Sequence, residues 1–320
     1  MINRIIYLLT GKNIALYALH RQSLPIINES YNRQRFIFIN ASQLWKKIPF
    51  KSTNKLKFRV MGAILTALSP TFILDINWIS RYQVFFHLWT KKHPQTKFVV
   101  LQHGSYIGGV VADRAHRFAH CNIFLTWGDY FTKLFHNYNV GKRLDVRSFG
   151  NPVFNEYDRS HFQYESNPGR TVLLAPSVIT LDKVPVWLNF ARQLLQAGYR
   201  VKLKEHKLQN KYGGVISGFD KEEKNIYDLL IKKKYGIVVT DHSSVLLDSI
   251  FFKNPVVVFS VHGDQPEFTA NSFTRVLGNR YDDFIAGTLN TELFHYVNIE
   301  RQEKLLESMM VSSNNRLTFL

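Results

Sequence analysis

The chain has 320 residues, of which 45% are hydrophobic and 20% charged, as in an ordinary globular protein with a packed core. Lysine and arginine outnumber aspartate and glutamate by 41 to 24, and the net charge of +17 indicates an anionic partner. The basic residues are spread, with no zinc-finger, homeodomain or RNA-binding signature, so no nucleic acid partner is expected. The single cysteine, Cys121, excludes intrachain disulfides and cysteine-rich metal sites, and favours a reducing compartment.

The first half of the chain alternates strand-like and helical segments. Its N-terminal apolar run is short, is broken at Gly11 and precedes no cleavage site, so we expect a first strand rather than a signal peptide. The apolar stretch 60–74 is too short to span a membrane. Strands are predicted at 5–10, 36–40, 71–76, 97–102, 122–127 and 146–149, and helices at 56–68, 79–91 and 130–138.

The second half repeats this alternation after a polar linker at 155–170. Strands are predicted at 171–175, 200–204, 236–240 and 256–259, and helices at 184–196, 221–234 and 291–310. Strands that alternate with helices form parallel sheets. We therefore predict an α/β fold of two Rossmann-like, doubly wound domains facing across a cleft: 1–154 for the acceptor, 155–290 for a nucleotide donor, and a helical segment at 291–320.

The segment 236–259 carries the clearest functional signal. A strand ends at Asp241, and His242, Ser243 and Ser244 follow at the start of a helix that contains Asp248. A helix N-terminus has unpaired N–H groups and partial positive charge, so this turn is predicted to bind the donor phosphates. Asp248 is a weaker candidate for a ribose hydroxyl. The alternative is that the serines only cap the helix.

A second candidate is the loop after the strand at 97–102. It begins with His103 and continues with the substrate-loop residues Gly104, Ser105, Gly108 and Gly109. Imidazole titrates near neutrality and can accept a proton from an attacking hydroxyl, and glycines allow close approach of a substrate. The alternative is a turn whose histidine binds a carbonyl.

A third candidate is the end of the strand at 200–204. Lys204 and His206 follow one another there and are predicted to bind a diphosphate and stabilise the leaving phosphate, with His206 as the second catalytic residue. The alternating lysines fit a solvated edge strand equally well. No Walker loop, GxGxxG fingerprint or metal-ligand spacing is present, so we expect no cofactor and no metal.

Three segments of the chain resemble GT-B type transferases of bacterial surface polysaccharides. In chain order they are QHG at 102–104, GNP at 150–152 and TDHSSVLLDSIFFKNPVVVF at 240–259. The nearest likeness is to the CDP-glycerol glycerophosphotransferase family of teichoic acid and capsule synthesis, over about residues 95–260. GNP and HG also recur in related sialyl- and Kdo-transferases. The chain departs from the family pattern at Lys207, where proline would follow, and at His242, where an aromatic residue is usual.

The resemblance implies a transferase with His103 as the base, and with Lys204, His206, Ser243 and Ser244 around the phosphates. Helix amides and cationic side chains would offset the charge on the leaving phosphate, so we expect this transferase to need no metal. It would move a sugar or polyol-phosphate from a nucleotide-activated donor, CMP or CDP type favoured, to a hydroxyl of a capsule, lipopolysaccharide or teichoic acid glycan or its lipid carrier. We expect a cytoplasmic protein, with a peripheral place on the anionic inner membrane surface as a hypothesis from charge. Two alternatives stay open: a UDP-N-acetylglucosamine 2-epimerase-like enzyme, and a non-catalytic scaffold that binds anions or nucleic acid.

Overall fold

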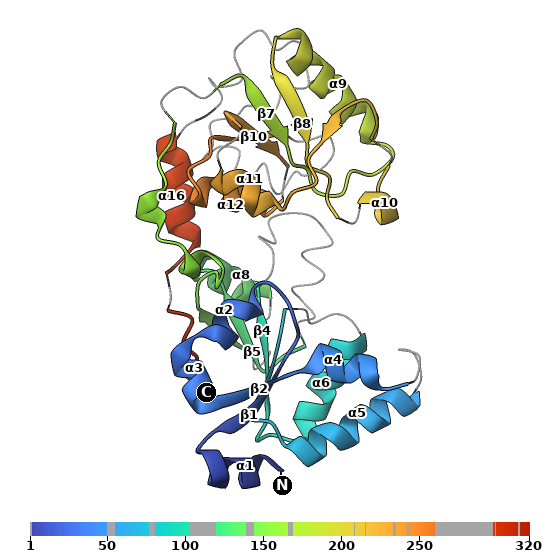
Figure 1. Ribbon diagram of the computed structural model, residues 1–320, viewed down its shortest axis with the longest axis vertical. Coiled ribbons are helices and arrows are strands. Elements are labelled where there is room, and N and C mark those ends of the chain that lie inside the picture. The colour runs from blue at the N-terminus through green and yellow to red at the C-terminus, as the bar shows by residue number, and fades with distance from the viewer. Residues whose placement is uncertain are drawn as a thin grey trace. The chain divides into compact units, whose positions relative to one another are not determined.

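The computed structural model describes residues 2–49, 55–76, 81–102, 120–138, 144–165, 169–207, 209–214, 216–232, 235–241, 243–259, 297, 299–312 and 314–320. These residues form two compact units (Figure 1). The first unit takes the described residues up to 102, those between 120 and 157, and those from 308 onward. The second unit takes the described residues between 158 and 307.

The first unit is built on a six-stranded parallel sheet in the order β2-β1-β3-β4-β5-β6. Its strands are β1 (Asn13–Tyr17), β2 (Phe36–Asn40), β3 (Phe72–Asp75), β4 (Lys97–Leu101), β5 (Ile123–Thr126) and β6 (Asp145–Ser148). β3 and β5 are buried along their whole length, as expected of central strands covered on both faces.

Helices cover both faces of this sheet. α4 (Ala41–Lys47), α5 (Lys55–Leu68) and α6 (Arg81–Lys92) lie on one side, and α2 (Ser23–Asn28) and α3 (Ser30–Arg35) on the other (Figure 1). α8 (Asp129–Tyr138) connects β5 to β6, and a 3-10 turn, η1 (Phe154–Glu156), follows β6. The predicted strands and helices from 36 to 149 are confirmed to within a few residues.

The predicted first strand at 5–10 is wrong, because residues 2–10 form a helix, α1 (Ile2–Thr10). Their apolar residues recur at helical spacing, three and four apart, rather than in alternation. Gly11, with φ of 68°, then ends the helix in a left-handed conformation that suits glycine. The first strand is β1, whose central residues Ile14, Ala15 and Leu16 are fully buried.

The second unit holds a five-stranded parallel sheet in the order β11-β10-β7-β8-β9. Its strands are β7 (Thr171–Leu174), β8 (Arg200–Leu203), β9 (Asp220–Lys221), β10 (Ile237–Thr240) and β11 (Val256–Val258). Its helices are α9 (Val184–Gln196), α10 (Gln209–Tyr212), α11 (Ile226–Ile231), α12 (Val245–Phe251) and all but the last two residues of α16 (Ile299–Met309), with a 3-10 turn, η2 (Arg159–His161). Two parallel sheets flanked by helices confirm the predicted α/β class.

The predicted helix at 221–234 is too long. Asn225 caps the shorter helix α11, since its side chain accepts a hydrogen bond from the Tyr227 backbone N–H at 3.1 Å. Residues 220–221 before this cap form the edge strand β9. Of the described lysines in this range, Lys221 lies in β9, Lys224 precedes the cap, and Lys232 follows the last residue of α11.

The predicted C-terminal helix is shorter than 291–310 in the described residues, and the chain beyond it returns to the first unit. Leu317 is fully buried in the core of the first sheet. The Arg35 guanidinium donates to the carbonyls of Leu317, at 3.1 Å, and Leu320, at 2.9 Å. A Cβ at Gly128 would lie 2.1 Å from the Met309 carbonyl oxygen. The C-terminal tail, the segment that follows α16, therefore passes residue 128 at a point where only glycine leaves room.

Candidate functional site

The strand order of the second sheet defines a place for a ligand. Strand β7 comes first in sequence, and its neighbours β8 and β10 are reached by crossovers in opposite directions. In open α/β sheets, ligands bind at such a switch point, outside the carboxyl ends of the strands. The residues that follow β7, β10 and β8 are therefore the candidates for the site.

A buried carboxylate joins the ends of β7 and β10 at this point. Asp241 is 8% exposed, and its Oδ1 accepts hydrogen bonds from the backbone N–H groups of Ser177, at 3.0 Å, and Ser243, at 3.1 Å. The Ser177 hydroxyl donates to the other carboxylate oxygen. These three donors satisfy a charge that would otherwise be costly to bury. Asp241 thereby fixes both strand-end turns against each other.

The turn after β10 leads directly into α12. The N-terminal cap of this helix is Ser244, whose side chain makes no capping hydrogen bond, while the Ser243 hydroxyl accepts the Val245 N–H at 3.4 Å. Both serines are partly exposed. Their phosphate-binding role stays a prediction, and His242 lies outside the described residues.

The end of β8 brings two further predicted residues to the same edge. Burial lowers the pKa of His206, as does the charge of Lys207, while the Asp241 carboxylate opposes them. The Asp241 charge therefore reaches His206, although 35 residues separate the two in sequence. The Lys204 ammonium donates to the backbone carbonyls of Glu222, at 3.0 Å, and Glu223, at 3.3 Å, and so ties β8 to the segment after β9.

Asp248 occupies a different environment from the other candidates. It is 4% exposed on α12, and its Oδ1 accepts a hydrogen bond from the Tyr227 hydroxyl at 3.1 Å. This contact links α12 to α11 inside the second unit. The predicted ribose contact is not tested by this arrangement.

The predicted substrate loop of the first unit, with His103, Gly104, Ser105, Gly108 and Gly109, lies outside the described residues. The residue before it, Gln102, is fully buried. Its Oε1 accepts the Trp127 backbone N–H at 2.8 Å, and its carbonyl accepts the Trp127 indole N–H at 3.0 Å. The end of β4 is thus held firmly to the end of β5.

Sequence reasoning did not select Ser177, and it named Asp241 only as the residue at which a strand ends. The available signal was positional: Ser177 stands three residues after the strand that begins the second sheet, and Asp241 directly follows β10. Ser177 and Asp241 pair because β7 and β10 are neighbours in the sheet, and the predicted strand positions do not specify which strands are neighbours.

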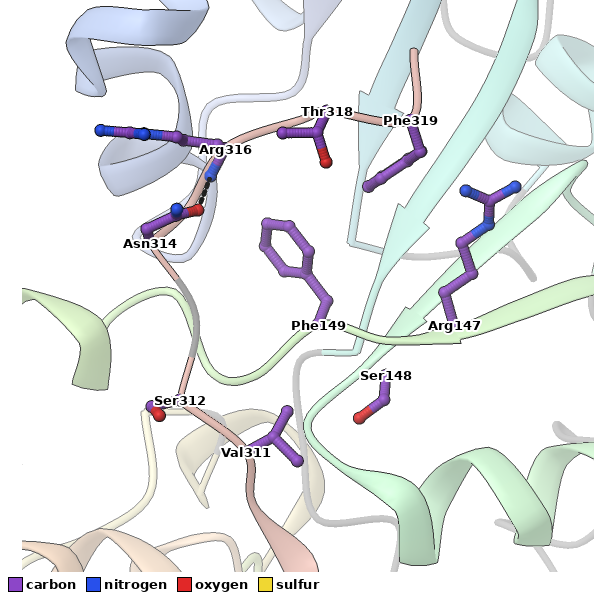
Figure 2. A pocket seen from close by; sticks show the side chains of 9 residues that line it. All are labelled: Arg147, Ser148, Phe149, Val311, Ser312, Asn314, Arg316, Thr318 and Phe319. Carbon is purple, nitrogen blue, oxygen red and sulfur yellow. Dashed lines mark hydrogen bonds between the residues drawn. The ribbon is translucent and has the colours of Figure 1, made fainter.

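A separate hollow of about 480 Å³ lies on the first unit, between the end of β6 and the C-terminal tail (Figure 2). It is lined by Arg147, Ser148, Phe149, Val311, Ser312, Asn314, Arg316, Thr318 and Phe319. Arg147 pairs with Asp145 at 2.6 Å and lies 4.8 Å from the Phe319 ring centroid. The Arg316 guanidinium points away from the hollow (Figure 2). Arg147 thus packs on Phe319 of the tail, and Arg316 of the tail pairs with Glu29 at 3.5 Å.

No known protein family and no curated protein matches this chain in sequence. Solved structures do match. A variant of the wall teichoic acid polymerase TagF is 13% identical with a TM-score of 0.54, over 94% of this chain and 85% of that one. The glycotransferase of kitacinnamycin is 12% identical with a TM-score of 0.54, over 92% and 94%. A glycosyltransferase from Rickettsia africae ESF-5 is 13% identical with a TM-score of 0.51, over 95% and 96%.

These likenesses concern the fold. They confirm the predicted class of two Rossmann-like domains of the GT-B type. Within the described residues, no helix is both long and apolar enough to cross a membrane.

Proposed function

We propose that this protein is a metal-independent transferase that moves a sugar or polyol-phosphate from a nucleotide-activated donor to a hydroxyl group of a bacterial surface glycan. The observation that carries the proposal is the group formed by Ser177, Asp241 and His206 at the switch point of the second sheet. Support for the transferase class comes from the fold, which resembles structures named as a teichoic acid polymerase and as glycosyltransferases.

In this proposal the second unit binds the donor. Asp241 is already satisfied by three protein donors, so its function is to hold the Ser177 and Ser243 turns in place and to act on His206 through its negative charge. The His206 pKa, which burial lowers, rises again when a phosphate group lies beside the ring. A protonated His206 then donates a hydrogen bond to the leaving phosphate and offsets its charge.

The acceptor hydroxyl is activated by His103, as the family resemblance implies. Its oxygen attacks the transferred group and forms the new bond, while the bond to the nucleotide phosphate breaks and the proton passes to the imidazole. The nucleotide leaves with the electron pair of the broken bond. A cytidine nucleotide is favoured because the sequence resembles the CDP-glycerol family.

The first test measures the melting temperature with CMP, CDP and UDP. We expect a cytidine nucleotide to stabilise the protein by several degrees, since a ligand that binds the folded state shifts unfolding. No nucleotide-specific stabilisation would favour the scaffold alternative and contradict the proposal. Stabilisation by UDP alone, with conversion of a UDP-sugar in the absence of an acceptor, would favour the epimerase alternative.

The second test uses the variant His103→Ala, with His161→Ala as its control. His161 is an exposed histidine of the second unit, with a side chain that is 78% accessible. We expect His103→Ala to abolish transfer and to leave nucleotide stabilisation unchanged, and His161→Ala to retain both. Normal turnover by His103→Ala would remove His103 from the mechanism.

A further inference from the structure

Helix α1 leaves much of its apolar surface uncovered. Ile5, Leu8 and Leu9 are 51%, 76% and 78% exposed, and no residue of the helix is buried. Their spacing of three and four residues places them on one arc of the helix, called the outer arc below. An apolar arc of this kind on a folded protein marks an interaction surface.

The helix is nevertheless fixed to the sheet by its other side. The Asn3 side-chain oxygen accepts the Ile14 backbone N–H at 2.6 Å, at the second residue of β1. α1 also packs against β1 and α5, and it lies at the amino end of β1 (Figure 1). The outer arc is thus presented by an ordered helix at one defined edge of the sheet.

Basic side chains gather at the same edge. The strands of the first sheet are parallel, so they all begin at this edge, here called the amino edge. Six cationic residues lie on α1, at strand starts, or at the helix ends that precede them: Arg4, Lys12, Arg33, Lys91, Lys92 and Lys97. Within the described part of the chain, none of these six forms an ion pair.

The acidic residues of this edge are compensated. Asp145, at the start of β6, pairs with Arg147 at 2.6 Å. Glu29, before α3, has Arg316 at 3.5 Å. The amino edge therefore combines an uncovered apolar arc with unpaired positive charge.

We propose that the amino edge of the first sheet docks the protein on an anionic lipid bilayer, with the outer arc of α1 inserted at the boundary of headgroups and acyl chains. Leucine and isoleucine side chains enter that boundary, and lysine and arginine attract anionic headgroups. A second copy of the chain would bring the same positive edge against itself, and like charges oppose a symmetric contact. An anionic bilayer offers an apolar interior to the outer arc and negative charge to the basic residues.

The first experiment measures sedimentation of the protein with phosphatidylcholine vesicles that contain or lack phosphatidylglycerol. We expect binding only to the anionic vesicles, and the double variant Leu8→Gln with Leu9→Gln should weaken it about tenfold by removing inserted apolar surface. The matched control is Leu181→Gln with Leu195→Gln, since these leucines are 78% and 47% exposed on the second unit. The control should bind as the wild type does.

The second experiment tests the charge. Lys91→Gln with Lys92→Gln should weaken binding about tenfold and reduce its dependence on salt, because each basic residue near the surface adds to the attraction. Lys224→Gln with Lys232→Gln removes two exposed lysines from the second unit and should have little effect. Equal losses in both pairs would overturn the proposed surface and indicate attraction by net charge alone.

Insertion itself is measured with a nitroxide attached to the variant Leu8→Cys. Cys121 is buried, and burial raises the pKa of its thiol, so the reagent reacts at the exposed position. Power-saturation spectroscopy should place the label below the headgroups of anionic vesicles.

The proposal fails if the wild type does not bind these vesicles, if the label stays in water, or if Leu8→Gln with Leu9→Gln turns a dimer into a monomer. No nucleotide is present, so these outcomes are independent of the transferase proposal.

Discussion

The carboxyl edges of the two sheets use polar residues in opposite ways. In the second unit, the partly exposed Ser177 donates hydrogen bonds to the nearly buried Asp241, whose charge also acts on the partly exposed His206. In the first unit, the described strand ends carry Gln102 and Asp75, which are 0% and 2% exposed. Gln102 binds Trp127, and the Asp75 carboxylate accepts a hydrogen bond from the Gln83 amide at 3.0 Å.

The difference shows that position in the fold does not by itself decide what a polar residue does. The same strand-end location supplies structural hydrogen bonds where the residue is covered, and under the proposed function it supplies ligand-binding groups where the residue remains accessible. We therefore expect variants at the first edge to reduce stability and variants at the second edge to reduce nucleotide binding. Three measurements test this separation.

The largest effect is expected from Gln102→Leu. The substitution leaves the buried N–H of Trp127 without its acceptor, which costs about 2 kcal/mol in the free energy of unfolding. Urea unfolding measures the loss, and Gln95→Leu, at an exposed turn residue, is the control and should change stability by less than about 0.5 kcal/mol. Equal effects of the two variants would contradict the structural role of the first edge.

A smaller effect is expected from Ser177→Ala, which removes the hydroxyl that donates to Asp241. The Ser243 turn is then held less firmly, and we expect nucleotide binding to weaken about fivefold, the equivalent of one hydrogen bond. Ser160→Ala is a matched control, because Ser160 also donates to one aspartate, Asp158, through both its N–H and its hydroxyl. Titration calorimetry compares the nucleotide affinities of the two variants. Unchanged affinity in Ser177→Ala would show that the hydrogen bond between Ser177 and Asp241 does not contribute to nucleotide binding.

The smallest effect is a change in proton binding at His206. Because its pKa lies below the ordinary 6.5, the free protein holds this imidazole mostly neutral near neutral pH. A bound phosphate raises the pKa, so nucleotide binding should take up a fraction of a proton and should tighten as the pH falls from about 7 to about 6.

Calorimetry in buffers of different ionisation enthalpy measures this proton uptake. It should disappear in His206→Gln and persist in His161→Gln. In the absence of nucleotide, the lowered pKa of His206 affects the stability of the fold. The unfolded chain binds the proton more readily than the folded protein, so His206 reduces stability as the pH falls below 6.5. The same uptake in wild type and His206→Gln would exclude His206 from phosphate binding.

Local sequence patterns predict much of this fold. Helix α9 has the predicted limits, 184–196, because its apolar residues keep a helical period and Gly198, with φ of 81°, ends the segment. The buried strands are short runs of valine, isoleucine, leucine and phenylalanine that no helical period explains. The N-terminal helix was missed because nine residues with six apolar members fit a strand in composition, and only the spacing distinguishes the two.

The candidate site was only partly predictable. Lys204, His206, Ser243 and Ser244 stand at strand ends and could be selected one by one. The contact between Ser177 and Asp241, 64 residues apart, depends on β7 and β10 being neighbours, which is a property of the whole sheet. The backbone contacts of Lys204 likewise require the segment after β9 to lie beside β8.

The returning tail has a consequence for how the chain acquires its structure during translation. Leu317 completes the apolar core of the first unit, and Asn32 donates to the Asn315 carbonyl at 2.8 Å, yet these partners leave the ribosome some 280 residues apart. The nascent first unit must therefore wait, with part of its hydrophobic interior uncovered, until the entire second unit has been made. A chaperone that shields this face would have its longest period of engagement in that interval.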